Sequence, residues 1–110
     1  MNTTNRTLNK HGFSDSDLDQ LKLTFQNFPD IESVLLFGSR AKGTFKAASD
    51  VDLALIYEKD DYHIASAVKA QLEEETKIPY FFDVLDHKTI SSEELKEHIR
   101  QHGVEIYRRV

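Results

Sequence analysis

Two short groups of residues, close together in the chain, carry side chains that could do chemistry. The first group is Gly38-Ser39, which is followed by the basic residues Arg40 and Lys42. Glycine lets the backbone turn sharply and lets a ligand come close. The hydroxyl of Ser39 and the amides after Gly38 can face an anion such as phosphate, and the two basic side chains would add positive charge. This group predicts a phosphate-binding turn.

The second group is the acid pair Asp50 and Asp52, which opens an apolar run. In a strand the two carboxylates would share one face, with Cα atoms roughly 7 Å apart, while Val51 points into the core. Like charges so placed repel each other, and Mg²⁺, which joins carboxylates to substrate phosphates, would relieve that repulsion. Alone, a Gly-Ser turn or an Asp-x-Asp strand end is usually only structural. In this order, between two apolar strands, they predict phosphoryl or nucleotidyl transfer.

The strands on either side must bring these two groups together. Continuous apolar runs predict a first strand over residues 31–37 and a second over residues 51–57, with a short helix or turn over residues 40–44. The link between the strands is short, which favours antiparallel pairing. That pairing puts the end of the first strand beside the start of the second, and so the turn beside the acids.

Helices are predicted around these strands. Apolar residues at helical spacing predict helices over residues 15–27, with Ser14 as N-cap, and over residues 62–76. A Ser-x-x-Glu capping box that begins at Ser91 predicts a further helix, ended by Gly103.

The order of these elements predicts an α/β fold with a single mixed sheet flanked by helices. The chain is expected to form one domain over residues 13–110, preceded by a flexible N-terminal arm over residues 1–12. Residues 104–107 are expected to form an extended tail that docks on the sheet.

A third strand is predicted over residues 79–85, with Asp83 in its middle. A charge in an apolar strand is costly unless it is paired or bound to a metal. Asp83 is therefore a candidate ligand or, alternatively, a salt-bridged residue on an edge strand. Asp86 lies past the predicted strand end and on the other face, so it ranks second.

Composition narrows the classes of function. The chain has 110 residues and a formal net charge of −5. An acidic protein binds nucleic acid poorly without sequence specificity, because that affinity comes mainly from contacts of basic groups with phosphates. Long DNA or RNA is therefore not the expected main partner. No apolar run is long enough to span a bilayer, and no secretory signal is visible at the N-terminus. The absence of cysteine excludes disulfides and thiolate metal sites, and a cytoplasmic location is expected.

Other polar groups carry weaker signals. His98 and His102 are four residues apart and could bind zinc, but a solvated helix face is the favoured interpretation. The acidic run over residues 73–75 is likewise expected to be a solvated face.

The quoted residues resemble a known family. Gly38-Ser39, ten further residues and then Asp50-Val51-Asp52-Leu53 resemble the signature of the DNA polymerase β-like nucleotidyltransferase superfamily. The fuller form, Phe-Gly-Ser-Arg-Ala-Lys-Gly-Thr followed by Ser-Asp-Val-Asp-Leu, is similar to its minimal nucleotidyltransferase (MNT) branch, which includes the MntA-like antitoxins. The resemblance covers residues 28–107 and implies the polymerase β-like nucleotidyltransferase fold.

The resemblance also implies a chemistry and a set of site residues. The implied reaction is transfer of AMP from ATP to a hydroxyl, with release of pyrophosphate. By the same resemblance, the triphosphate would lie over Gly38 and Ser39, and two Mg²⁺ ions would be held by Asp50, Asp52 and Asp83. Asp83 matches the third carboxylate of the superfamily and would be either a ligand or the general base.

The acceptor is implied only by the family. MNT proteins that resemble this chain are commonly paired with a small helical HEPN ribonuclease toxin and silence it by adenylylation, so the leading hypothesis is an antitoxin. A homo-oligomer would be another way to complete the site. Two alternatives stay open: a small-molecule acceptor, or a non-catalytic binding module that neutralises its partner by contact.

Overall fold

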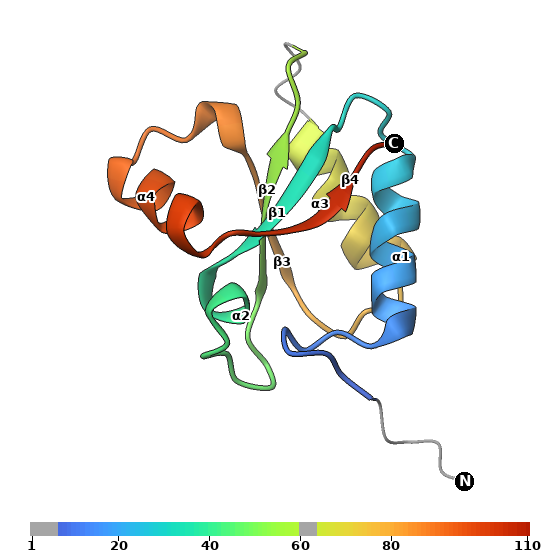
Figure 1. Cartoon of the computed structure of the whole chain (residues 1–110). Helices are drawn as coiled ribbons and strands as arrows, with labels where there is room; N and C mark the ends of the chain where they lie inside the picture. Colours follow the sequence, from blue (N-terminus) through green and yellow to red (C-terminus); the bar gives the residue numbers. More distant parts are fainter. Residues whose placement is uncertain (1–6, 60–63) are drawn as a thin grey trace, which may run out of the picture.

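The protein is an α/β sandwich built on one small sheet (Figure 1). The computed structural model describes residues 7–59 and 64–110. In chain order the elements are α1 (Asp15–Gln26), β1 (Ser33–Phe37), α2 (Gly38–Lys42), β2 (Val51–Ile56), α3 (Ile64–Glu75), β3 (Phe82–Asp86), the 3₁₀ turn η1 (His87–Thr89), α4 (Glu93–His102) and β4 (Val104–Arg108).

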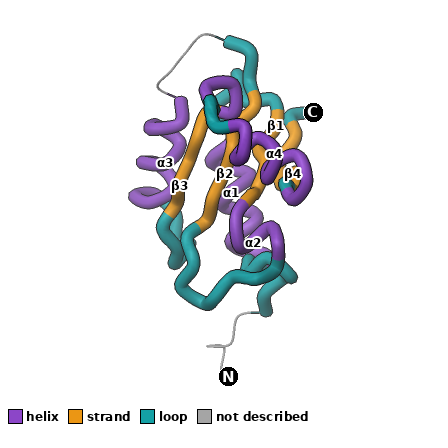
Figure 2. Tube along the Cα trace, turned by 90° about the vertical axis from the view of Figure 1, so that its left-hand side faces the viewer, coloured by secondary structure: helices purple, strands orange, loops and turns teal. Residues whose placement is uncertain are grey.

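The sheet has the strand order β3-β2-β1-β4 and is mixed. β1 runs antiparallel to both β2 and β4, whereas β2 and β3 run parallel, with α3 as the crossover between them. The predicted mixed sheet, the antiparallel pairing of the first two strands and the docking of the extended tail are confirmed. Viewed from the side, α1 and α3 lie behind the sheet and α4 lies in front of it (Figure 2).

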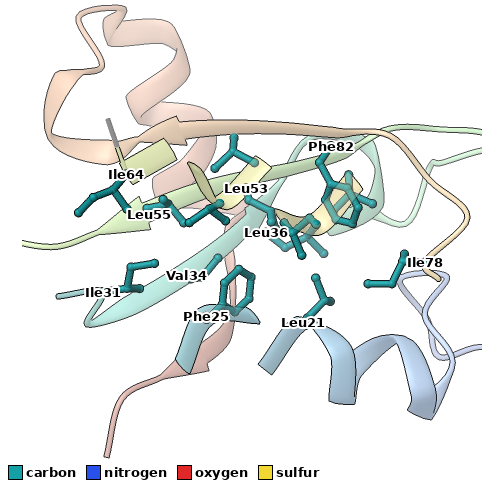
Figure 3. Packing of buried hydrophobic residues seen from close by; sticks show 14 of the residues in the cluster. Leu21, Phe25, Ile31, Val34, Leu36, Leu53, Leu55, Ile64, Ile78 and Phe82 are labelled. Carbon is teal, nitrogen blue, oxygen red and sulfur yellow. The ribbon is translucent and has the colours of Figure 1, made fainter. Parts of the chain in front are cut away.

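The main core fills the space between the sheet and the α1–α3 layer. Alternate residues of β1 and β2, among them Leu36 and Leu53, point at Leu21 and Phe25 of α1 (Figure 3). All four side chains are at most 2% exposed. Burying one such side chain is worth roughly 1.5–3 kcal/mol, so this layer supplies most of the stability of the domain.

A second, smaller cluster holds α4 on the opposite face. Phe37 of β1, Ala54 of β2 and Ile99 of α4 are buried together, with Leu35 and Leu95 partly buried around them. β1 and β2 therefore have apolar contacts on both faces, which explains why they read as continuous apolar runs.

The caps of two helices differ in how well the sequence predicted them. Ser14 and Asp17 form a capping box at the start of α1, as the N-cap assignment of Ser14 anticipated. The capping box predicted at Ser91 is wrong: Ser92 is the N-cap of α4, and its hydroxyl accepts from the amide of Leu95. Leucine at that third position cannot reach back to the cap, so α4 has only half of a capping box.

The N-terminal boundary also needs correction. Residues 9–12 were included in the expected flexible arm, but they form a turn in which the amides of Gly12 and His11 donate to Asn9. His11 is only 8% exposed, because the turn packs against Arg40. The folded part therefore starts before residue 13. Residues 60–63, which were expected to contain a turn and the start of α3, lie outside the described residues.

The free edge of β3 is covered by two side chains from α3. Glu73 accepts from the amide of Phe82 at 3.0 Å, and the ammonium of Lys69 donates to the carbonyl of the same residue. Glu73 is therefore more than part of a solvated face, because it satisfies an edge amide that would otherwise be free to pair with another chain. Within the described ranges, no helix has the length and apolar content needed to cross a bilayer.

Candidate active site

The strand register brings the predicted turn and acids to one edge of the sheet. Phe37, the last residue of β1, pairs with Asp52 on β2, and Asp52 in turn pairs with Asp83 on β3. Gly38 follows directly and opens α2 (Figure 1). Asp52 thus lies between the predicted phosphate-binding turn and Asp83. Residues that are far apart in the sequence meet here because β2 is the central partner of both neighbouring strands.

Gly38 is required by two features of its surroundings. Its φ of 75° is a left-handed conformation that L side chains rarely adopt. In addition, a Cβ atom at this position would lie 2.2 Å from Oδ2 of Asp52. The missing side chain therefore lets the Asp52 carboxylate lie directly against the backbone of the turn.

Asp52 has the perturbed electrostatics expected of a functional carboxylate. Burial and the negative charges of Asp83 and Asp50 together raise the pKa of Asp52 from 3.8 to about 6, although the positive charge of Arg40 acts in the opposite direction. The charges of Asp83 and Asp50 therefore disfavour the ionised form of Asp52. Perturbed carboxylates of this kind are concentrated at functional sites.

Asp83 and Asp50 differ from Asp52 in exposure. Both are solvent-exposed, and Asp50 directly precedes β2. The cost predicted for a charge in this strand does not arise at Asp83, because β3 is an edge strand and the carboxylate reaches water. Across the described part of the chain, Asp83 makes no ion pair, so the salt-bridge alternative is not supported either.

The donor set fits a hard divalent cation in its chemistry. Carboxylate oxygens are the ligands that Mg²⁺ prefers, and a cation near Asp52 would relieve the repulsion from Asp83 and Asp50. In residues 7–59 and 64–110, however, no three His, Asp or Glu side chains lie close enough together to hold a metal. The carboxylates are therefore neighbours without being a closed ligand cage.

Arg40 is directed away from solvent and into a structural site. The side chain is 1% exposed, its guanidinium donates to the carbonyls of His11 and Ser49, and it lies 3.9 Å from the ring centroid of Tyr80. These contacts occupy the donors that were predicted to bind phosphate. What Arg40 does contribute to the site is its charge, which lowers the pKa of Asp52.

The other two residues of the predicted turn lie open to a ligand. Ser39 is half-buried and Lys42 is exposed, both on α2. The backbone of the turn is fixed by the C-cap glycine, whose amide donates to the carbonyls of Ser39 and Arg40. These hydrogen bonds hold the backbone of the turn, and among the described residues no partner occupies the hydroxyl of Ser39 or the ammonium of Lys42.

Sequence reasoning missed one residue that lies at this turn. The amide of Gly38 donates to Nε2 of His98 on α4 at 2.9 Å. His98 is half-buried and stacks edge-on against Phe37, whereas His102 is exposed. The favoured interpretation of a solvated helix face is wrong for His98 and right for His102. Only the tertiary packing of α4 on β1, which no local pattern encodes, could have revealed the contact.

Asp86 belongs to the core face and not to the site. It is the last residue of β3, so the prediction that it lies past the strand end is wrong. The carboxylate is 8% exposed and accepts a hydrogen bond from the hydroxyl of Tyr57 at 2.6 Å. As expected from strand alternation, it points away from the face that carries Asp83.

With this geometry described, comparison with known proteins defines the class. The family model described as polymerase beta, nucleotidyltransferase, matches residues 19–110. The chain belongs to this family and is a nucleotidyltransferase.

A relative of the chain carries a more specific name. The "probable protein adenylyltransferase MntA" of Haemophilus influenzae is 35% identical over 85 residues, which cover 77% of this chain and 74% of the relative. The similarity confirms the predicted resemblance to the MntA-like minimal nucleotidyltransferases.

Solved structures agree on the fold. A toxin–antitoxin crystal structure with AMP-PNP contains a chain that superposes with a TM-score of 0.67 at 22% identity, over 84% of this chain and 74% of that one. A mutant of the MntA–HpeT toxin–antitoxin matches with a TM-score of 0.62 at 17% identity, over 93% of this chain and 75% of that one. These matches confirm the predicted polymerase β-like nucleotidyltransferase fold.

Proposed function

We propose that this nucleotidyltransferase transfers AMP from ATP to a hydroxyl on a partner protein, and that it acts as the antitoxin of a small helical toxin of the HEPN class. The name of the Haemophilus influenzae relative supports a protein acceptor. The toxin–antitoxin structures support both a toxin partner and an adenine nucleotide as donor.

One observation carries the proposal. Asp52 lies against the side-chain-free Gly38 on one side and beside Asp83 on the other. A pure binding module would gain stability by losing this repulsive cluster, whereas transfer of a nucleotidyl group needs carboxylates next to a phosphate-binding turn.

Different residues of the chain would bind the metal ion and the triphosphate. Asp50 and Asp52 would hold Mg²⁺, with Asp83 as a further ligand or as the base, and substrate phosphates would supply other ligands of the ion. When bound, Mg²⁺ supplies charge neutralisation of the phosphates and a lowered pKa for the attacking hydroxyl. Gly38 and Ser39 would hold the triphosphate through an amide and a hydroxyl.

The transfer itself exchanges a phosphoanhydride linkage of ATP for a phosphoester linkage to the acceptor. The acceptor oxygen forms a bond to the α-phosphorus, the bond from that phosphorus to the bridging oxygen breaks, and pyrophosphate leaves. The proton of the acceptor hydroxyl must go to a base. Asp83 is suited to this role because it is exposed on the solvent side of Asp52.

The surroundings of Asp83 favour a macromolecular acceptor. Phe81 is 74% exposed, although it is a large apolar side chain. Its carbonyl accepts from the amide of Val51, which fixes it at the same edge of the sheet as the acids. An exposed aromatic side chain beside an open site is a contact that a protein partner can bury.

The test is the intact mass of the small helical protein encoded beside this chain, after incubation with this chain, ATP and Mg²⁺. We expect a gain of one or more AMP units with the wild type and none with the Asp50→Asn, Asp52→Asn double variant. A tight complex without any mass gain would support neutralisation by contact instead. If there is no complex and no mass gain, the acceptor should be sought among small molecules.

A further inference from the structure

A histidine from α4 occupies the amide that opens the phosphate-binding turn. The amide of Gly38 donates to Nε2 of His98, and the imidazole is half-buried at this place. An acceptor at this nitrogen requires the neutral ring with its proton on Nδ1. His98 therefore stands where an anion bound to the Gly38 amide would lie.

The groups around His98 are basic on two sides. His102, one turn further along α4, has its ring centroid 5.3 Å away, and Lys42 of α2 acts on His98 through its charge. Phe37 of β1 packs edge-on against the ring, and the acid Asp52 lies on the other side of Gly38. Burial, His102 and Lys42 together lower the pKa of His98, which keeps the ring neutral at rest.

We propose that His98 is a further triphosphate-binding residue: a phosphate oxygen enters between the Gly38 amide and Nε2, and His98 takes up a proton and donates to that oxygen. The proposal rests on the proposed nucleotide-transfer function and adds a wall to its donor site, contributed by α4.

The exchange is physically balanced. At rest, His98 satisfies an amide that would otherwise lack a partner. When the triphosphate binds, its oxygen accepts from the amide in place of His98, and the nearby negative charge favours the protonated imidazole. The new contact is a charge-assisted hydrogen bond, which is stronger than the neutral one it replaces. Nucleotide binding should therefore be coupled to proton uptake.

The competing explanation is that His98 only fastens α4 to α2. The variant His98→Gln distinguishes this structural role from phosphate binding, because the side-chain amide oxygen of glutamine can accept a hydrogen bond from the Gly38 amide but cannot take up a proton. If the role is only structural, glutamine should preserve both stability and nucleotide affinity. Under the proposal, glutamine preserves stability and loses affinity.

The experiment is calorimetric titration of the full chain with AMP-PNP and Mg²⁺ between pH 6.5 and pH 9. Near pH 6.5 we expect His98→Gln to bind AMP-PNP about tenfold more weakly than wild type, which is the size of effect that the loss of a charge-assisted hydrogen bond produces. This difference in affinity should shrink as the pH rises. Because Asp52 titrates in both proteins, the comparison isolates His98. The control is His87→Gln on η1, which follows the opposite end of β3 and should match wild type.

Two further readouts complete the test. Titration in buffers of different ionisation enthalpy should show that wild type takes up close to one more proton on binding than His98→Gln. AMP, which lacks the β- and γ-phosphates, should bind both proteins equally. Equal AMP-PNP affinity at every pH, or equal proton uptake, would overturn the proposal. A failure of protein adenylylation would leave these binding results unchanged, so the two failures can be told apart.

Discussion

Replacing Asp52 by asparagine should stabilise the folded protein while abolishing AMP transfer. The carboxylate is half-buried and repelled by Asp83 and Asp50, which together with burial raises the pKa of Asp52 from 3.8 to about 6. At about 1.4 kcal/mol for each pH unit, this rise corresponds to at most about 3 kcal/mol of destabilisation at neutral pH. Solvent screening of a half-buried group reduces the expected effect to about 1 kcal/mol.

The sign of the effect depends on pH. Above about pH 6, Asp52 is charged in both the folded and the unfolded chain, so the wild type bears the full penalty. As the pH falls from about 6 to about 4, the folded protein takes up a proton at Asp52 before the unfolded chain does, and the penalty disappears. The stability difference between Asp52→Asn and wild type should therefore be greatest above pH 7 and close to zero below pH 4.

Urea unfolding at pH 8, 6 and 4 measures this difference. We expect an increase of about 1 kcal/mol at pH 8, which corresponds to a rise in Tm of roughly 4–8 °C for a domain of this size. The matched control is Asp19→Asn on the exposed face of α1, which should change stability by less than about 0.5 kcal/mol. A difference that does not vary with pH, or a less stable Asp52→Asn at pH 8, would refute the electrostatic reasoning.

The same variant should lose AMP transfer by about three orders of magnitude, because the several kcal/mol that a bound metal contributes depend on this carboxylate. The assay is the mass gain of the partner over time. Transfer at the wild-type rate would show that Asp52 is not needed for the chemistry, whatever its effect on stability.

Three further predictions concern the surroundings of the site. Gly38→Ala should lower the free energy of unfolding by about 1–2 kcal/mol in urea, because alanine disfavours the left-handed backbone. The added Cβ should also displace the Asp52 carboxylate and slow AMP transfer, and an unchanged transfer rate would contradict the close approach of Asp52 to Gly38. Arg40→Gln should destabilise the domain by about 2–3 kcal/mol, because the guanidinium's hydrogen bonds to carbonyl groups are lost. It should also raise the pKa of Asp52 further in a carbon-13 titration, and a lower pKa would contradict the role of the Arg40 charge. Ser14→Ala should lower stability by about 1 kcal/mol without affecting nucleotide affinity, and weaker binding would show that α1 is coupled to the site.

Local patterns predicted the parts of the site that one stretch of sequence encodes. The end of β1, the turn and the start of β2 are adjacent in the chain, so antiparallel pairing of two apolar runs was enough to bring Gly38 close to Asp52. Asp83 was also predicted, although the cost of a charge in an apolar strand does not apply to an exposed residue on an edge strand. Its position depends on the parallel register of β2 and β3, which α3 sets at long range.

What could not be predicted depends on tertiary contacts. Arg40 carries the same charge whether it faces phosphate or the interior, and only the approach of His11 and Ser49 decides between them. His98 sits on a helix whose outer positions are charged, and the apolar contacts of Ile99 set which side of that helix faces β1. Strand ends shifted for a similar reason, since backbone pairing and not apolarity determines where β3 begins.

The burial of Arg40 has a consequence for the N-terminal segment. Within the described residues the guanidinium is held by carbonyl groups and aromatic rings and forms no direct ion pair, and one of those carbonyls belongs to His11. Removing residues 7–12, or holding them elsewhere through a fusion partner, would therefore leave a buried cation without one of its acceptors. The turn over residues 9–12 is thereby linked to the electrostatics of Asp52, because His11 helps to hold the guanidinium whose charge lowers the pKa of that carboxylate.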